Sequence, residues 1–396
     1  MMDYERSLSK RAQEIQPSGI RKFFDLIDGK SDVIALTVGQ PDFVTPWHIR
    51  EAAIETLEGG KTYYTANAGL AALRAEISAY MKRRFDLSYS QSDEIIVTVG
   101  GSEAIDLAVR ALVDPGDEVI VPIPSFVCYG PIVSLACGKP VYVELEEKDG
   151  FKLTPEKLRA AITERTKLLV LPFPNNPTGS IMTKSDLEEI ADVIREREIY
   201  VLSDEIYAEL TYGTKHCSIA SVEGMRERTI IASGFSKAYA MTGWRLGYTL
   251  APREITKQML KIHQYAIMCS PTASQYAGIE AMMNGDSDVE QMRDEYNRRR
   301  LYIVNGLRNA GIDCYEPQGA FYVFPYVGKF GLSSEEFCTK LLNEAGVAVV
   351  PGTAFGECGE GFVRISYAYS VRHISQALER IGRFVNGLRP PKEEEH

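Results

Sequence analysis

Seven short apolar runs recur between residues 95 and 250, and segments long enough to form helices separate them. Strands that are apolar on both faces and alternate with helices are typical of a largely parallel sheet covered by helices on each side. Ligands of such sheets bind beyond the carboxyl ends of the strands, so we expect the chemistry in the loops that follow the runs. The runs are Ile95 to Val99, Glu118 to Val121, Pro140 to Leu145, Leu168 to Leu171, Ile199 to Leu202, Thr229 to Ala232 and Leu246 to Leu250.

The chain has 396 residues, which is long enough for two domains. Near residue 285 the composition turns polar, and a long charged helix with shorter strand-like and helical patterns follows. We therefore predict a large domain over 41–285 and a smaller α+β domain formed by 1–40 together with 286–390. The charged, proline-bearing end, 391–396, is predicted to be disordered.

Charge and cysteine content exclude several classes of protein. The net charge is -10 and no basic block is long enough to follow a phosphate backbone, so neither nucleic acid nor membrane is expected as a partner. Seven cysteines, odd in number and without a Cys-x-x-Cys pair, argue against a disulfide framework or a zinc site and for a reducing compartment. No apolar run has the length of a membrane span, and residues 1–16 contain no apolar signal region. We expect a cytoplasmic protein that holds no metal.

Small residues follow the first of the apolar runs. Gly100, Gly101 and Ser102 lead from that run into a predicted helix. The free N–H groups and the positive dipole end of a helix N-terminus form a ready phosphate site. A tight turn capped by Ser102 is the structural alternative.

Three later strand ends carry further polar groups. Asn176 lies between prolines in a stiff loop, Asp204 follows a buried run, and Lys237 lies among small and apolar residues. Burial lowers the pKa of a lysine and makes its amine nucleophilic. The structural alternatives are an ordinary turn, a helix cap and a lysine whose head reaches water. Together the strand ends supply what a pyridoxal phosphate site requires, namely a phosphate anchor, a partner for the pyridine nitrogen, donors to the phenolic oxygen and an amine.

Three motifs resemble those of one enzyme family. Ser233 to Gly247 reads S-G-F-S-K-A-Y-A-M-T-G-W-R-L-G, Asn175 to Gly179 reads N-N-P-T-G, and Ser203 to Tyr207 reads S-D-E-I-Y. In this order they resemble the class I/II aminotransferases, which are pyridoxal-phosphate-dependent enzymes of fold type I. The resemblance implies a large domain with a mostly parallel seven-stranded sheet flanked by helices, plus a smaller α+β domain. Other phrases of the chain are similar to the prokaryotic branch that holds aspartate, aromatic and N-acetyl-diaminopimelate aminotransferases.

The resemblance implies catalytic roles for Lys237, Asp204 and Tyr207. Lys237 would carry the cofactor as a Schiff base and then move the proton between the substrate Cα and the cofactor. Asp204 would keep the pyridine nitrogen protonated. Tyr207 and Asn176 would hydrogen-bond the phenolic oxygen, and Asn176 would also lie beside the substrate.

The resemblance also implies which residues hold the cofactor. Many relatives carry a phosphate-binding serine three residues before the lysine, where this chain has Gly234. Ser233 and Ser236 are left as alternatives, and Ser236 is the one we expect. The remaining contacts would be made by Arg245, Gly101 and Ser102 to the phosphate and by Phe126 to the face of the ring.

Contacts beyond the cofactor are implied as well. Arg364 would bind the substrate α-carboxylate through two guanidinium nitrogens, and the backbone of Gly39 would contact the same carboxylate. Tyr64 would reach the phosphate of the neighbouring subunit's cofactor, which implies a homodimer with shared active sites. The aromatic residues that could either line an apolar side-chain pocket or pack in the core are Tyr63, Tyr322 and Phe355.

The predicted activity is the transfer of an amino group from an L-amino acid to a 2-oxo acid, with 2-oxoglutarate as the acceptor. The donor stays open among N-acetyl-LL-diaminopimelate, aspartate and an aromatic amino acid. A cysteine-S-conjugate β-lyase with the same cofactor is an alternative. A non-enzymatic regulator domain is a third class, but such proteins carry a basic DNA-binding module in front, and the segment before Val33 is too short for one.

Overall fold

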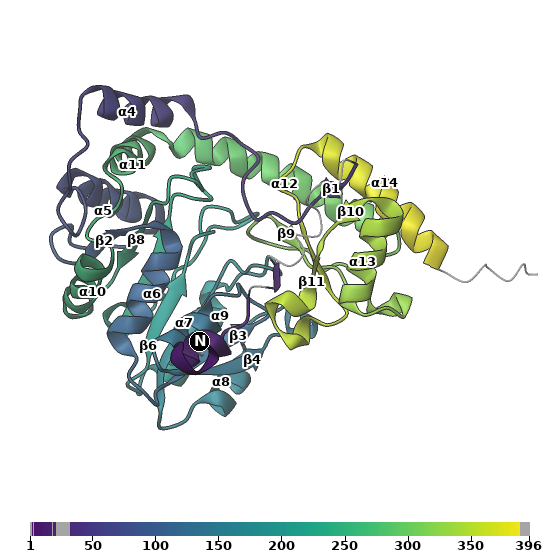
Figure 1. The fold of residues 1–396 in the computed structure, drawn as a ribbon, viewed down its shortest axis with the longest axis horizontal. Coiled ribbons are helices and arrows are strands. Elements are labelled where there is room, and N and C mark those ends of the chain that lie inside the picture. The colour runs from purple at the N-terminus through teal and green to yellow at the C-terminus, as the bar shows by residue number, and fades with distance from the viewer. Residues whose placement is uncertain (1, 3, 18, 21–31, 389–396) are drawn as a thin grey trace, which may run out of the picture.

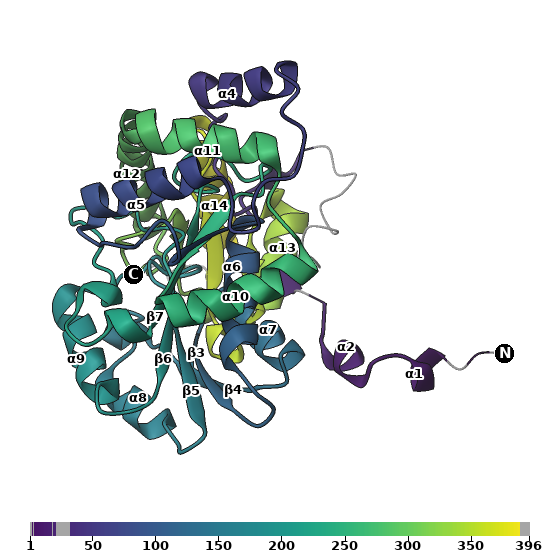
Figure 2. The same cartoon turned by 90° about the vertical axis from the view of Figure 1, so that its left-hand side faces the viewer.

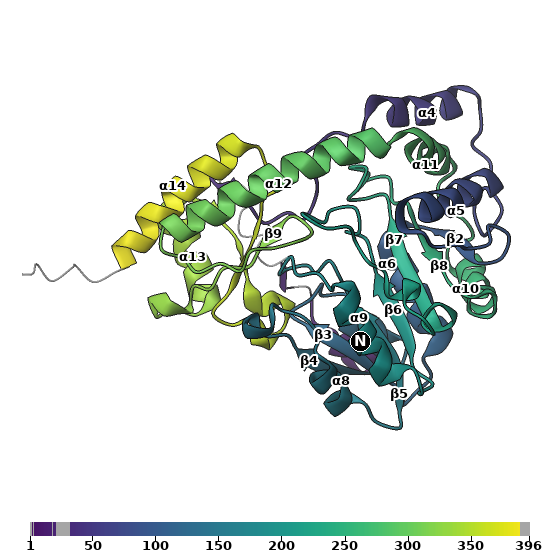
Figure 3. The ribbon, with the colours of Figure 1, turned by 180° about the vertical axis from the view of Figure 1, so that it is seen from behind.

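The molecule has a large layered part and a smaller part that holds the C-terminal helices (Figure 1). The computed structural model describes residues 2, 4–17, 19–20 and 32–388, so the predicted disordered tail at 391–396 lies outside the described residues. The long helix α12 (Asp286–Asn309) runs from the large part to the small one (Figure 3).

The seven predicted runs form one seven-stranded sheet in the large part. The strands β4, β3, β5, β6 and β7 pair in parallel, whereas β8 is antiparallel to both of its neighbours, β7 and β2. The prediction of a mostly parallel seven-stranded sheet is therefore confirmed. Across the sheet the strands are β2 (Ile95–Thr98), β8 (Gly247–Leu250), β7 (Thr229–Gly234), β6 (Tyr200–Asp204), β5 (Thr166–Leu171), β3 (Glu118–Ile123) and β4 (Lys139–Glu144).

Helices cover both faces of this sheet. Successive residues of a strand point to opposite faces, so each strand contributes apolar side chains to both layers of helices. In β3, Ile120 packs with α8 and α9, whereas Val119 and Val121 pack with α6, α7 and α10. Figure 2 shows these two groups of helices on opposite sides of the strands. Among the described helices, none combines the length and the apolar sequence needed to cross a membrane. The helices of this part are α4 (Trp47–Glu58), α5 (Ala71–Phe85), α6 (Gly100–Leu112), α7 (Tyr129–Leu135), α8 (Pro155–Ala161), α9 (Lys184–Ile194), α10 (Arg253–Ala266) and α11 (Thr272–Asn284).

The small part combines segments from both ends of the chain. β1 (Ile34–Ala35) pairs in parallel with β10 (Val347–Ala348), and Ile34 and Leu36 share a core with side chains of the C-terminal helices. The domain boundaries at 40 and 285 stay predictions. The other elements are β9 (Tyr322–Val323), β11 (Val350–Pro351) and β12 (Val363–Ser366), which form an antiparallel sheet, and the helices α13 (Ser334–Ala345) and α14 (Val371–Leu388).

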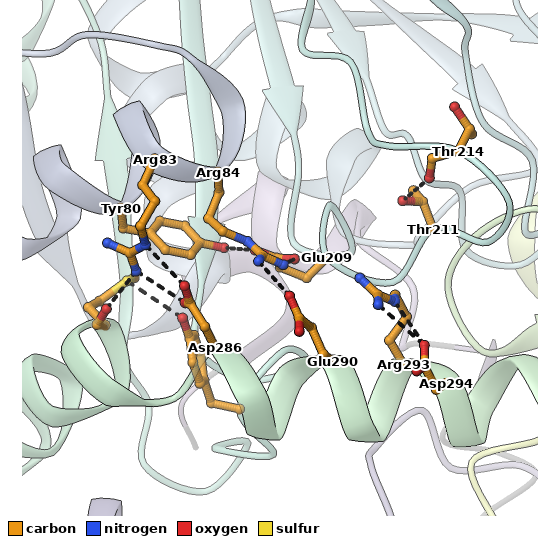
Figure 4. A network of polar contacts seen from close by, with 12 residues as sticks. Tyr80, Arg83, Arg84, Glu209, Thr211, Thr214, Asp286, Glu290, Arg293 and Asp294 are labelled. Carbon is orange, nitrogen blue, oxygen red and sulfur yellow. Dashed lines mark hydrogen bonds and ion pairs between the residues drawn. The ribbon is translucent and has the colours of Figure 1, made fainter.

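An ionic network joins α5 and the first turns of α12 to the segment after β6 (Figure 4). Arg84 Nη2 lies 2.7 Å from Glu209 Oε2, and Arg84 Nη1 lies 3.0 Å from Glu290 Oε1 in α12. The Tyr80 hydroxyl donates a hydrogen bond of 2.6 Å to Glu209 Oε1. Glu209 is buried, and a buried carboxylate is costly without such partners. Since Glu209 follows Tyr207 by two residues, the network also fixes the segment that carries a predicted catalytic residue.

Gly247 lies where β8 passes the start of α6. A Cβ atom added to Gly247 would lie 2.5 Å from the carbonyl carbon of Gly100 and 2.8 Å from the Gly101 nitrogen. Because backbone cannot move aside as the end of a side chain can, we expect Gly247→Ala to lower the free energy of unfolding by about 1–3 kcal/mol in urea denaturation. Gly243→Ala is the matched control, since nothing lies within 4 Å of its added Cβ. Equal stability of the two variants would contradict this account.

Candidate active site

A cavity of about 410 Å³ lies between the large part and the small part. Asp204 at the end of β6, Lys237 after β7 and Arg364 in β12 all line it. The structure therefore brings together side chains from strand ends that are far apart in the sequence. The predicted site residues on its wall are Gly39, Gly101, Ser102, Phe126, Asn176, Asp204, Tyr207, Ser236, Lys237, Arg245 and Arg364.

One end of the cavity is built for an anion. Gly101 and Ser102 lie in the first turn of α6, where backbone N–H groups have no acceptor within the helix. Gly100 has a φ of 76°, and a Cβ atom there would lie 2.5 Å from Arg245 Nη2. Glycine is thus what lets the Arg245 guanidinium approach the start of the helix. We call these four residues the anion cradle.

The two alternative serines lie in different surroundings. Ser236 lines the cavity beside Lys237. Ser233 lies in β7, and its hydroxyl donates a hydrogen bond of 3.3 Å to the Glu205 carbonyl. Of the two, Ser236 is the serine on the cavity wall.

Lys237 is a partly buried amine near two other cations, Arg364 and Arg245. Burial lowers its pKa to about 8 from the ordinary 10.5, and the charges of Arg364 and Arg245 act in the same direction, while Asp204 opposes them. The Nζ atom donates a hydrogen bond of 2.5 Å to the Gly39 carbonyl. A far larger share of this amine than of an ordinary lysine is therefore neutral near physiological pH, as a nucleophile or a base requires.

Asp204 is held by a partner that sequence reasoning missed. The buried Tyr129 hydroxyl donates a hydrogen bond of 2.7 Å to Asp204 Oδ2, and the Ile206 N–H donates to Oδ1 at 3.2 Å. Burial raises the pKa of the Asp204 carboxyl, and these two hydrogen bonds oppose that rise. Tyr129 follows Phe126 by three residues at the start of α7, and no feature of the sequence distinguishes it from a core tyrosine.

Arg364 is completely buried, and only part of its hydrogen-bonding capacity is used. Nη1 donates to Asn176 Oδ1 at 2.9 Å, and Nη2 donates to the Thr37 carbonyl at 2.6 Å. Nε is buried and has no hydrogen-bond partner among the described residues. The rings of Tyr322 and Phe355 lie 4.6 and 4.8 Å from the guanidinium carbon. Burial lowers the pKa of Arg364, so an anion in the cavity would stabilise its charge.

Tyr322 contacts three of the predicted site residues. Its hydroxyl is hydrogen-bonded to the Tyr207 hydroxyl at 2.8 Å, and a Cβ atom at Gly39 would lie 2.3 Å from the Tyr322 oxygen. With its ring against Arg364, Tyr322 joins the predicted catalytic phenol to the predicted carboxylate clamp. From the sequence, Tyr322 could either line a side-chain pocket or pack in the core, and the structure places it on the cavity wall.

Two of the predicted aromatic residues lie away from the cavity. Tyr64 is 78% exposed and does not line it, so this side chain does not contribute to the site of its own chain. Tyr63 is 61% exposed and is also absent from the wall. The predicted role of Tyr64 therefore depends on a second subunit.

These residues fit pyridoxal phosphate. The anion cradle suits the phosphate, Asp204 suits a protonated ring nitrogen, and Lys237 supplies an amine on the same cavity. Such an arrangement on a mostly parallel sheet with a smaller α+β part defines a pyridoxal-phosphate-dependent enzyme of fold type I.

Comparison with known proteins gives the family. Residues 31–381 match the family described as aminotransferase class I and II. YugH of Bacillus subtilis, named as an aminotransferase, is 54% identical over 96% of this chain and 98% of its own. A second Bacillus subtilis protein, named for N-acetyl-LL-diaminopimelate aminotransferase activity, is 46% identical over 96% of each chain. The structure of aspartate aminotransferase from Thermus thermophilus with maleate has a TM-score of 0.91 and 41% identity, and the match covers 96% of this chain and 99% of that one.

The chain belongs to the class I and II aminotransferase family. It is a pyridoxal-phosphate-dependent transferase that moves an amino group between an amino acid and a 2-oxo acid. The predicted family, fold class, cofactor and reaction are confirmed. All the relatives named above are aminotransferases, and nothing in them favours the β-lyase alternative.

The lowered pKa of Lys237 predicts how stability depends on pH. In the unfolded chain the amine keeps a pKa near 10.5, whereas in the cofactor-free folded protein its pKa is about 8. The folded state therefore pays about 3 kcal/mol below pH 8 for burying the charge, and this cost disappears as the pH rises from about 8 to 10.5. We expect Lys237→Met to stabilise the cofactor-free protein by about 3 kcal/mol more at pH 7 than at pH 10.5 in urea denaturation. A stability difference independent of pH would show that the amine is not buried as a cation.

Proposed function

We propose that the residues on the cavity wall perform the amino-group transfer in the roles given below, with 2-oxoglutarate as the acceptor. The observation that carries this proposal is the meeting of a partly buried amine, Lys237, with a buried acid, Asp204, and a partly used guanidinium, Arg364, on one cavity. None of the three residues alone requires this chemistry, but a structural role for each does not explain why all three face one cavity.

The cofactor, when bound, supplies an electron sink for the negative charge that develops at the substrate Cα. Lys237 holds it through Nζ and afterwards uses the freed amine to accept and return the Cα proton. The carboxylate of Asp204, kept in place by Tyr129, holds a proton on the ring nitrogen. The hydroxyl of Tyr207 and the amide of Asn176 donate hydrogen bonds to the phenolic oxygen.

Arg364 orients the substrate. Asn176 and the Thr37 carbonyl fix the plane of its guanidinium. A planar fork held in this way binds a carboxylate at two points and leaves little rotational freedom. The Cα–H bond of the substrate is then held in the direction that proton transfer requires.

The amino donor is proposed from the relatives. Relatives of this chain are named as aminotransferases of N-acetyl-LL-diaminopimelate, of aspartate and of aromatic amino acids. A biosynthetic amino donor of one of these kinds fits the cavity, because each carries the α-carboxylate that Arg364 binds. The cysteines of the chain are free, which supports the proposal of a reducing, cytoplasmic location.

A donor panel tests the proposed reaction. With 2-oxoglutarate as acceptor, we expect glutamate to form from at least one of aspartate, phenylalanine, tyrosine and N-acetyl-LL-diaminopimelate, measured by glutamate dehydrogenase. Lys237→Ala should abolish turnover, because no other amine lines the described wall. Keto acid released from cystathionine without any acceptor would instead indicate a lyase. Absence of transfer from every donor would contradict the proposed acceptor.

A homodimer with shared sites is also proposed. Tyr64 and its neighbour Tyr63 are exposed, and the Thr272 hydroxyl donates a hydrogen bond of 2.7 Å to the Tyr63 carbonyl. Three residues after Tyr64, the Asn67 side-chain amide donates a hydrogen bond of 2.8 Å to the Met268 carbonyl. Met268 is 45% exposed. These loops together expose apolar side chains of the kind that a subunit interface covers.

Hybrid dimers test the shared site. Tyr64→Ala and Lys237→Ala should each be weakly active or inactive alone, because both sites of the dimer then lack the same group. The two substitutions affect groups that different subunits contribute to one site. Mixed after dissociation, they should recover about a quarter of the wild-type activity, since half of the dimers are hybrid and each hybrid has one intact site. Arg245→Ala mixed with Lys237→Ala is the control, because both residues line the cavity of the same chain. No recovery in the first mixture would argue against a shared site.

A further inference from the structure

A buried pair lies behind the anion cradle and has no role in the reaction described so far. His263 in α10 is fully buried, and its Nδ1 lies 2.6 Å from Oε1 of Glu103 in the first turn of α6. The Glu103 side chain is only 9% exposed. The second oxygen, Oε2, accepts a hydrogen bond of 2.5 Å from the N–H of Val99, the last residue before α6. One carboxylate thus joins α10 to the turn that carries the anion cradle.

The surroundings of His263 assign its proton. Nε2 is buried and has no hydrogen-bond partner among the described residues. A proton on Nε2 would be a buried donor without an acceptor, which is costly. The neutral ring with its proton on Nδ1 avoids that cost and donates to Glu103. The Glu103 carboxylate is then held from two sides, by the His263 ring and by the Val99 N–H.

Glu103 would otherwise compete with the phosphate. An acidic side chain in the first helical turn is attracted to the positive end of the helix dipole and to the free N–H groups there. In α6 those groups belong to Gly101 and Ser102, which are proposed to bind the cofactor phosphate. A Glu103 carboxylate that turned towards them would occupy the anion cradle with the protein's own charge.

We propose that His263 and Glu103 are positioning residues for the phosphate end of the cofactor. The pair keeps the Glu103 carboxylate away from the Gly101 and Ser102 N–H groups and fixes the turn that presents them. This inference rests on the proposed cofactor site, because it concerns the phosphate anchor of that site. The simpler alternative is a buried contact that only packs α10 against α6.

The test compares two ligands that differ in the phosphate alone. Cofactor-free wild type, His263→Leu and His263→Asn are titrated with pyridoxal phosphate and with pyridoxal, and the dissociation constants are read from protein fluorescence. We expect His263→Leu to weaken pyridoxal phosphate binding by about tenfold, the size of a helix-terminus charge effect, and to leave pyridoxal binding unchanged. His263→Asn should stay near wild type, because its amide nitrogen can replace Nδ1 as the donor.

A second substitution separates competition from packing. Adding Glu103→Gln to His263→Leu should restore pyridoxal phosphate binding, because glutamine keeps an acceptor for Val99 but has no charge to compete with phosphate. If His263→Leu does not fold, Glu103→Asp tests the same point, because its shorter carboxylate loses His263 but stays near the helix N-terminus. His48→Leu is the matched control, since His48 also bridges carboxylates, Glu280 at 2.6 Å and Asp288 at 3.0 Å, but joins α4 to α11 and α12 and not to the cradle helix α6.

Two results would overturn the inference. One is an equal loss of affinity for both ligands in His263→Leu, which is what a packing role produces. The other is unchanged pyridoxal phosphate binding in a folded His263→Leu or Glu103→Asp variant. If wild type itself does not bind pyridoxal phosphate, the proposed cofactor site is wrong. The measurement therefore distinguishes the failure of that proposal from the failure of this one.

Discussion

A hydrogen bond of Arg364 joins the small part of the molecule to the large part beside the cavity. A cation from β12 in the small part is tied to Asn176, in the loop after β5, and to Thr37 near the N-terminal strand. Burying a guanidinium costs free energy unless its donors are used. Two of its nitrogens donate hydrogen bonds, and Nε has no partner among the described residues. The described residues therefore do not satisfy all the hydrogen-bond donors of this guanidinium. We predict that an anionic ligand that satisfies them also draws the two parts together.

The same cavity contains more positive than negative charge. Lys237, Arg245 and Arg364 line it, and Asp204 is the acidic residue on the described wall. This excess contributes to the low pKa of Lys237. Both the cofactor and the amino-acid substrate bring negative charge to the cavity, so each bound anion offsets the repulsion among these cations. The pKa of the amine is therefore expected to depend on which anions are bound, and that dependence is useful for a group that must be neutral at one step and protonated at another.

The sequence predicted the sheet because burial on both faces leaves a plain signal, an apolar run without alternation. It could not predict that β8 is antiparallel, because an apolar run has no direction. The strand ends predicted Gly101, Ser102, Asn176, Asp204 and Lys237 on the cavity wall for a similar reason, since parallel strands deliver their following loops to one edge. Gly39, Phe126, Arg245 and Arg364 on the same wall were found only through the family resemblance. Tyr129 and the His263–Glu103 pair were missed because their roles come from contacts between distant elements. Tyr64 was found only through the family resemblance, since its proposed partner belongs to another chain.

An aminotransferase must accept two different side chains in the same place, one from the donor and one from the acceptor. In the roles proposed above, the charged residues on the described wall all address parts that every substrate shares: Arg364 the α-carboxylate, Lys237 the Cα proton, and Asp204 and Arg245 the cofactor. None of them is left to recognise a side chain. Tyr322 adds to the wall an aromatic ring whose apolar surface tolerates several side chains. In this proposal, selection among donors comes from weaker apolar contacts and from groups of the proposed second subunit, and relatives similar to this chain can then be named for different substrates.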